Sequence, residues 1–135
     1  MRIEVSKGEL IDKITILEIK DDRVKDEEKL KNIRHELDVL LKYEFQTPLL
    51  KERLKGINNA LWDFEDEIRK MEDENDFGEK FIKTARNIYT FNDERAKIKR
   101  LINLEQDSDI IEEKSYHLKR CPVFRHEPGI DWINE

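Results

Sequence analysis

The sequence contains few residues that break helices or cross-link a chain. Among 135 residues there are four glycines, three prolines and a single cysteine, Cys121. Scarce glycine and proline argue against a loop-rich or all-β protein, and one cysteine excludes a disulfide framework within the chain. No apolar run approaches the roughly 18 residues that a membrane-spanning helix needs, and residues 1–5 lack the apolar core of a secretory signal. We therefore expect a cytoplasmic protein without a membrane-spanning segment.

Charged side chains take the place of the missing residues. The chain carries 26 Lys or Arg and 32 Asp or Glu, which gives an acidic protein with a formal net charge of −6. Such a charge does not favour binding to nucleic acid. Leu, Ile, Val and Phe still account for 39 of the 135 residues, above the roughly one in five below which chains tend to stay disordered. The length suits one domain with a packed core.

Apolar residues recur at helical spacing along four segments. A capping box at Ser6–Glu9 begins the first, which runs to about Val24 after a short extended N-terminus. The second runs from about residue 26 to 45, the third from 48 to 72, with Pro48 in its first turn, and the fourth from 79 to 103. Short connections predict that the last three helices are antiparallel neighbours. We predict an all-α fold over residues 1–116, an antiparallel bundle or coiled-coil hairpin of about four helices, followed by an irregular C-terminal arm over residues 117–135.

The third helix has the most regular pattern, because its apolar residues repeat over three heptads. The residues expected to be buried between the third and fourth helices are Leu54, Ile57, Leu61, Phe64, Ile88 and Ile98.

The first helix is apolar on two faces. Leu10, Ile14 and Leu17 lie on one face, and Ile16 and Ile19 lie nearly opposite. A helix of this kind is usually buried on two sides. We expect it either at the centre of the bundle or at the interface of a homodimer.

Two charged residues lie where apolar ones are expected. Arg95 lies on the apolar stripe of the fourth helix, and Asp12 lies between the apolar residues of the second face of the first helix. A buried charge needs a partner or a ligand. We therefore expect Asp12, Asp63 or Asp93 within reach of Arg95, with Asn58 or Asn59 contributing.

Two interpretations of these charges stay open. They form a polar network that fixes the register of the helices, or they line a pocket between helices that binds an anion. For the pocket, the candidate ligand-binding residues are Asp12, Lys13, Trp62, Asp63, Asn92, Asp93, Arg95 and Lys99. A closed pocket around Arg95 and Lys99 would favour a ligand, whereas cations exposed on a solid core would favour a structural role.

Signatures of metal sites and of catalysis are weak. Carboxylates three residues apart occur at Glu9/Asp12, Glu18/Asp21 and Asp63/Asp66, but such pairs arise by chance in a chain with 32 acids. The spacing of His117, Cys121 and His126 is not that of a zinc site. No phosphate-binding loop, dinucleotide fingerprint or Ser/His/Asp grouping is present. We expect no metal, no cofactor and, on balance, no enzyme.

Four segments, residues 6–20, 59–66, 92–103 and 112–116, together resemble a family of small helical bacterial and phage proteins catalogued only as a domain of unknown function. The resemblance covers about residues 1–116, and the tail beyond it looks particular to this chain. Members are sometimes encoded near surface-polysaccharide biosynthesis genes. The resemblance therefore implies a helical domain and a link to that pathway, but no reaction.

Two functions remain in competition. The first is a helical accessory or scaffold module that binds another protein and forms a homodimer, without contact to nucleic acid or membrane. The alternative is a small all-α enzyme, or a binder of an anionic small molecule, with its pocket around Arg95.

Overall fold

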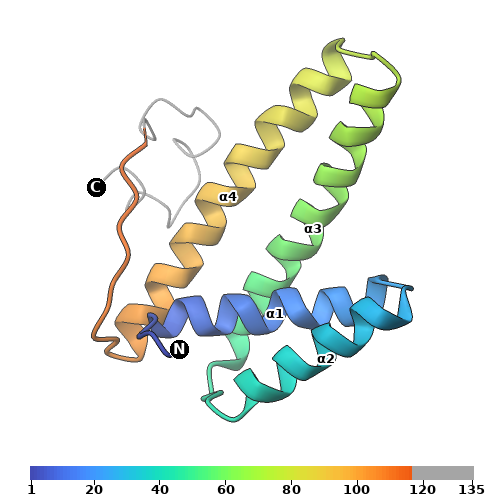
Figure 1. Cartoon of the computed structure of the whole chain (residues 1–135). Coiled ribbons are helices and arrows are strands. Elements are labelled where there is room, and N and C mark those ends of the chain that lie inside the picture. The colour runs from blue at the N-terminus through green and yellow to red at the C-terminus, as the bar shows by residue number, and fades with distance from the viewer. Residues whose placement is uncertain (117–135) are drawn as a thin grey trace.

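The computed structural model describes residues 1–116, which fold into four helices (Figure 1). These are α1 (Lys7–Arg23), α2 (Glu27–Leu41), α3 (Pro48–Asp73) and α4 (Glu79–Glu105). The all-α prediction is confirmed for this part of the chain, and none of these helices is long and apolar enough to cross a membrane. The predicted C-terminal arm, residues 117–135, lies outside the described residues.

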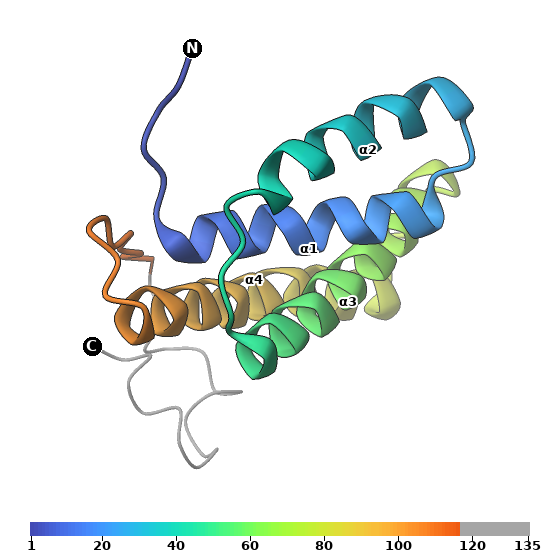
Figure 2. The ribbon, with the colours of Figure 1, turned by 90° about the horizontal axis from the view of Figure 1, so that it is seen from below.

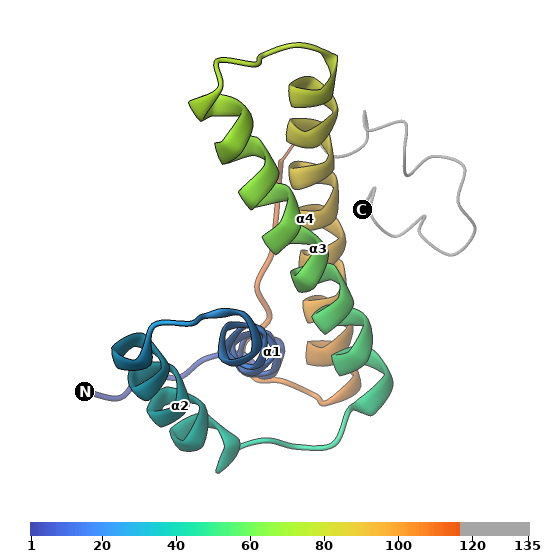
Figure 3. The ribbon, with the colours of Figure 1, turned by 90° about the vertical axis from the view of Figure 1, so that its right-hand side faces the viewer.

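The two longest helices, α3 and α4, form an antiparallel hairpin, and α1 crosses one end of it (Figure 1). α2 runs back along the far side of α1, so α1 lies between α2 and the hairpin (Figures 2 and 3). The prediction that α2 is a direct neighbour of α3 is therefore wrong. A short connection allows two helices to pack together but does not require it, and here the apolar stripe of α2 faces α1.

α1 occupies the centre of the fold, as its two apolar faces indicate. Ile14 and Leu17 are buried on one face. Asp21 shares that face, and its carboxylate accepts a 2.7 Å hydrogen bond from Arg34 of α2. This face therefore meets α2, while the opposite face, with the buried Ile19, meets the hairpin.

The main core lies where α1 crosses the hairpin. Ile11 of α1 packs there with Leu54 of α3 and with Ile98 and Ile102 of α4. Of the residues predicted to be buried, Leu54, Leu61 and Ile98 are buried, whereas Ile57, Phe64 and Ile88 are only partly so. Phe64 packs edge-on against Phe91 of α4. Ile88 belongs to the part of the hairpin that extends past α1, where two helices alone cannot enclose their shared seam.

The start of α1 is fixed against the end of α4. The Ser6 hydroxyl accepts a 3.1 Å hydrogen bond from the Glu9 N–H, which is half of the predicted capping box. The Glu9 side chain does not complete the box and instead accepts from Lys99 at 2.7 Å. Gly8 allows the close approach, since its N–H donates to Asn103 Oδ1 at 2.6 Å and an added Cβ would lie 2.3 Å from the Lys99 carbonyl oxygen.

The outer half of the hairpin, residues 67–89, is here called the distal hairpin. Among residues 1–116, no hydrogen bond or ion pair joins its side chains to α1 or α2. Its apolar side chains include Phe77 and Ile82, which are 51% and 56% exposed. The fold thus combines a compact base with a projecting pair of helices.

Candidate functional site

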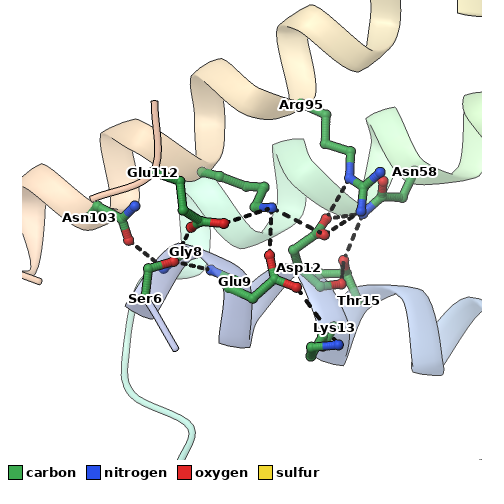
Figure 4. A network of polar contacts seen from close by, with 11 residues as sticks. Ser6, Gly8, Glu9, Asp12, Lys13, Thr15, Asn58, Arg95, Asn103 and Glu112 are labelled. Atoms are coloured by element: carbon green, nitrogen blue, oxygen red, sulfur yellow. Dashed lines mark hydrogen bonds and ion pairs between the residues drawn. The ribbon is translucent and has the colours of Figure 1, made fainter. Parts of the chain in front are cut away.

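Asp12 lies at the crossing of α1 and the hairpin, and its side chain is only 2% exposed. Arg95 of α4 donates to both of its carboxylate oxygens, through Nε at 2.9 Å and through Nη2 (Figure 4). Asn58 of α3 donates from Nδ2 to the same carboxylate at 2.9 Å and to Thr15 Oγ1 at 3.0 Å. One buried acid therefore joins three helices, and its charge is satisfied by hydrogen bonds, as burial requires.

Lys99 extends this arrangement toward the start of α1. Its ammonium nitrogen lies 2.7 Å from a Glu9 oxygen, 3.8 Å from Asp12 and 3.9 Å from Glu112. Glu9 also lies 3.7 Å from the Lys13 ammonium. We call the six charged residues together the Asp12 network: Glu9, Asp12, Lys13, Arg95, Lys99 and Glu112. Three cations face three carboxylates, so the network has no net charge.

Arg95 is held in its charged form. The hydrogen bonds to Asp12 raise the pKa of Arg95, which outweighs the opposing effect of its partial burial, and the charges of Asp12 and Glu9 raise it further. The guanidinium side chain keeps 30% of its surface exposed. It is therefore a permanent cation whose charge is largely committed to α1.

The predicted site residues separate into three places. Asp12, Lys13, Arg95 and Lys99 come together in the Asp12 network. Of the three carboxylates expected near Arg95, Asp12 pairs with it, whereas Asp63 and Asp93 do not. Those two carboxylates lie on other faces of their helices and have cations of their own.

Asp63 accepts a 2.7 Å hydrogen bond from Arg23, at the end of α1. The same guanidinium lies 5.7 Å from the centre of the Trp62 ring. Asp93 faces the chain that follows α4 and lies 2.8 Å from the Lys114 ammonium. The predicted residues thus line more than one surface of the hairpin.

Sequence reasoning missed three partners of the predicted site residues: Arg23 beside Asp63, Lys114 beside Asp93, and Glu112 near Lys99. The segment after α4 turns back along that helix (Figure 1), where Glu113 pairs with Arg100 at 2.7 Å. Glu112 accepts a hydrogen bond from the Ser6 hydroxyl across more than a hundred residues of chain. No periodicity signals contacts of this kind, because they depend on how the segment after α4 folds back.

Three open pockets border Arg95, and the smallest, of about 220 Å³, lies over Glu9, Asp12 and Lys13. The two larger ones lie on either side of the hairpin. The first, here called the corner pocket, has a volume of about 430 Å³ and lies where α1 crosses the hairpin. Its lining comprises Ile16, Ile19, Asn58, Leu61, Trp62, Glu65, Asp66, Asn92 and Arg95. The second, of about 400 Å³, lies between α4 and the segment that follows it, and Asn92, Arg95 and Lys99 contribute to it. The arrangement is neither a closed anion pocket nor a row of cations in solvent.

The acidic pairs considered as metal ligands are engaged by cations. Glu18 lies 3.3 Å from Lys51 and 3.2 Å from Lys55, and the other pairs contribute to the contacts of Asp12, Asp21 and Asp63 described above. Within residues 1–116, no three His, Cys, Asp or Glu side chains gather in a way that could hold a metal ion. His117, Cys121 and His126 lie outside the described residues.

Comparison with known proteins gives one match. Residues 1–129 match the model of a family described as a family of unknown function (DUF6165). The match extends past Tyr116, so the tail up to residue 129 is not particular to this chain as the sequence had suggested. No curated protein and no solved structure matches.

Proposed function

Since this chain belongs to DUF6165, a family of unknown function, we propose its function from its geometry: it is a non-catalytic helical interaction module, an accessory or scaffold protein. In this proposal the base, held by the Asp12 network, fixes the hairpin, and the distal hairpin binds another protein chain. The observation that carries the proposal is the apolar surface of that projecting pair of helices.

Two helices can share only one seam, so an isolated hairpin leaves apolar surface on both of its sides. Met71 is buried in the distal hairpin, and Phe77 packs edge-on against Phe81 with ring centres 5.2 Å apart. Ile82 and Tyr89 nevertheless remain at least half exposed. Apolar surface gathered on one projecting element is typical of a binding surface.

The partner we propose for the distal hairpin is a second copy of the chain. Residues 67–89 contain six acids and five bases, so two copies would not repel each other strongly. Two antiparallel hairpins that pack together form a four-helix bundle, in which each seam gains the cover that it lacks in one chain.

Sedimentation equilibrium tests this proposal. The parent protein should be a dimer, and Ile82→Glu should shift it toward monomer because a charge would enter the new interface. The matched control is Leu49→Glu, because Leu49 is 77% exposed in the first turn of α3, at the other end of the hairpin. A parent that stays monomeric, or an equal effect of both substitutions, would contradict the proposal.

The alternative is a binder of an anionic small molecule, or a small enzyme, at Arg95 and Lys99. One observation favours it, since Arg95 and Asn92 line both of the larger pockets. The charge balance of the Asp12 network weighs against it, because an anion would have to displace Asp12 or Glu9 from their cations. The anion titration described at the end of the Discussion separates the two functions.

We also propose a cellular setting, which rests on the family resemblance of the sequence rather than on the fold. The module would act in the cytoplasm as an accessory to surface-polysaccharide biosynthesis. A deletion strain should then show altered surface polysaccharide. An unchanged polysaccharide profile would remove this setting and leave the proposal for the distal hairpin untouched.

A further inference from the structure

One hydrogen-bond acceptor that lines the corner pocket has no donor within residues 1–116. Asn58 is 7% exposed, and its Nδ2 group donates to Asp12 and Thr15. Because a carboxylate only accepts hydrogen bonds, these contacts fix the orientation of the amide. The carbonyl oxygen Oδ1 is left without a donor among residues 1–116, although Asn58 lines the pocket. The oxygen keeps contact with solvent, so a ligand in the pocket can reach it and donate to it.

Donors that lack acceptors line the same pocket. Arg95 uses Nε and Nη2 to bind Asp12, which leaves Nη1 without an acceptor in the described part of the chain. The side-chain amide of Asn92 makes no hydrogen bond within residues 1–116, and it too contributes to the lining. The pocket therefore offers one acceptor beside two sets of donors.

This pattern fits an amide group better than an anion. The carbonyl oxygen of an amide can accept from Arg95 or Asn92, while its N–H donates to Asn58 Oδ1. An anion would offer nothing to the Asn58 oxygen, and it would meet an arginine whose charge Asp12 already offsets.

The other residues that line the pocket determine which side chains a ligand can carry next to its amide group. Ile16, Ile19, Leu61 and Trp62 provide apolar surface for one side chain. Glu65 and Asp66 form an acidic rim on α3. Glu65 pairs with Arg69 at 3.2 Å, and the neighbouring Asp63 pairs with Arg23 at 2.7 Å. Asp66 forms no ion pair among the described residues and acts on Arg23 only through its charge. The rim therefore has one more carboxylate than cation, which favours a cation next to the apolar side chain.

We infer that the corner pocket binds a short peptide segment of a partner protein. The segment presents a backbone amide to Asn58 and Arg95, an apolar side chain to the surface around Trp62, and a neighbouring Lys or Arg to Asp66. The volume of about 430 Å³ lies within the range of about 300–1,000 Å³ usual for ligand pockets. This inference rests on the proposed role as an interaction module but uses a surface separate from the distal hairpin.

Nuclear magnetic resonance titration of the full-length chain tests the inference. The probe is the peptide acetyl-Lys-Leu-Lys-amide, and acetyl-Glu-Leu-Glu-amide is its charge-reversed control. The first peptide should shift the Trp62 indole N–H and the Asn92 side-chain amide in a saturable manner, with a Kd on the order of 1 mM or below. The acidic peptide should bind about tenfold more weakly, because Asp66 would repel it.

Two substitutions with matched controls connect binding to the pocket. Asn92→Leu should weaken binding of the basic peptide about tenfold, whereas Asn87→Leu on the same helix, outside the pocket, should leave it unchanged. Asp66→Asn should reduce the preference for the basic peptide, whereas Asp73→Asn near the end of α3 should not. Far-ultraviolet circular dichroism confirms that each variant is folded.

Several results would overturn the inference. These are the absence of saturable shifts at Trp62 and Asn92, binding that survives Asn92→Leu, or equal binding of N-acetylleucinamide, which would indicate a small-molecule site. A monomeric protein that binds the basic peptide would remove the proposal for the distal hairpin and keep this one. A dimeric protein that does not bind the peptide would remove this inference and keep the proposal for the distal hairpin.

Discussion

Replacing Asp12 by asparagine tests how the two halves of the fold are held together. The substitution keeps nearly the same volume, so it creates no cavity, and the new amide oxygen can still accept from Asn58. It removes the charge that faces Arg95 and Lys99, and it turns an amide N–H toward the donors of Arg95. The unfolding free energy of Asp12→Asn therefore reports the electrostatic contribution at the crossing of α1 and α4.

The expected loss follows from burial. Removing one partner of a buried ion pair costs about 3–5 kcal/mol. Because the Arg95 side chain is 30% exposed and can turn toward the corner pocket, we expect the lower end, about 3 kcal/mol. The control is Asp63→Asn, whose 2.7 Å pair with Arg23 lies at the surface, with Asp63 62% exposed. That change should cost about 0–1 kcal/mol.

Urea unfolding followed by circular dichroism measures both losses. With a denaturant dependence of about 1–3 kcal/mol per molar urea, a loss of about 3 kcal/mol lowers the midpoint by about 1–3 M. The dependence itself should stay unchanged. A loss for Asp12→Asn that lies within about 1 kcal/mol of the loss for Asp63→Asn would refute the reasoning, because it would show that the charge of Asp12 adds little to holding α1 on the hairpin.

Three further predictions concern single positions. Gly8→Ala should destabilise the fold by about 1–3 kcal/mol, because the added Cβ would lie 2.3 Å from the backbone of α4. Gly56→Ala should instead stabilise α3 by about 0.5–1 kcal/mol, because nothing lies within 4 Å of its added Cβ. Urea unfolding of the two variants compares these changes. Leu61→Ala should cost about 2–5 kcal/mol in the same assay, because Leu61 is buried between α3 and α4. Burial lowers the pKa of Lys51, but hydrogen bonds and charges from two glutamates outweigh it and raise the pKa above its ordinary 10.5. The stability lost in Lys51→Met should therefore be constant at neutral pH and should shrink only as pH rises through that raised pKa, which unfolding at several pH values checks.

The sequence predicts the helices because their causes are local. Pro48 in the first turn of α3, the Ser6 cap of α1 and the heptads of α3 each act within a few residues, and the structure has these helices close to where they were expected. The position of α2 could not be predicted in the same way. Periodicity shows that one face of a helix is buried, but it does not show which helix covers that face.

The same distinction applies to the candidate site. Asp12 and Arg95 could be singled out because a charge on an apolar face requires a partner, and the structure joins them across 83 residues of sequence. Glu112 could not be identified, because it reaches the cluster from outside the helices. The corner pocket could not be predicted from the sequence either, because it is formed by the angle at which α1 crosses the hairpin.

The central claim is that the charges of Arg95 and Lys99 are committed to holding α1, so that the protein acts by binding protein partners rather than anions. Thermal unfolding in increasing phosphate or citrate, against sodium chloride of matched ionic strength, tests it most directly. A ligand that binds the folded state raises Tm as its concentration passes Kd. The account predicts that neither anion raises Tm beyond the chloride control. A saturable increase that is lost in Arg95→Met and reduced in Lys99→Met would contradict it and establish an anion site.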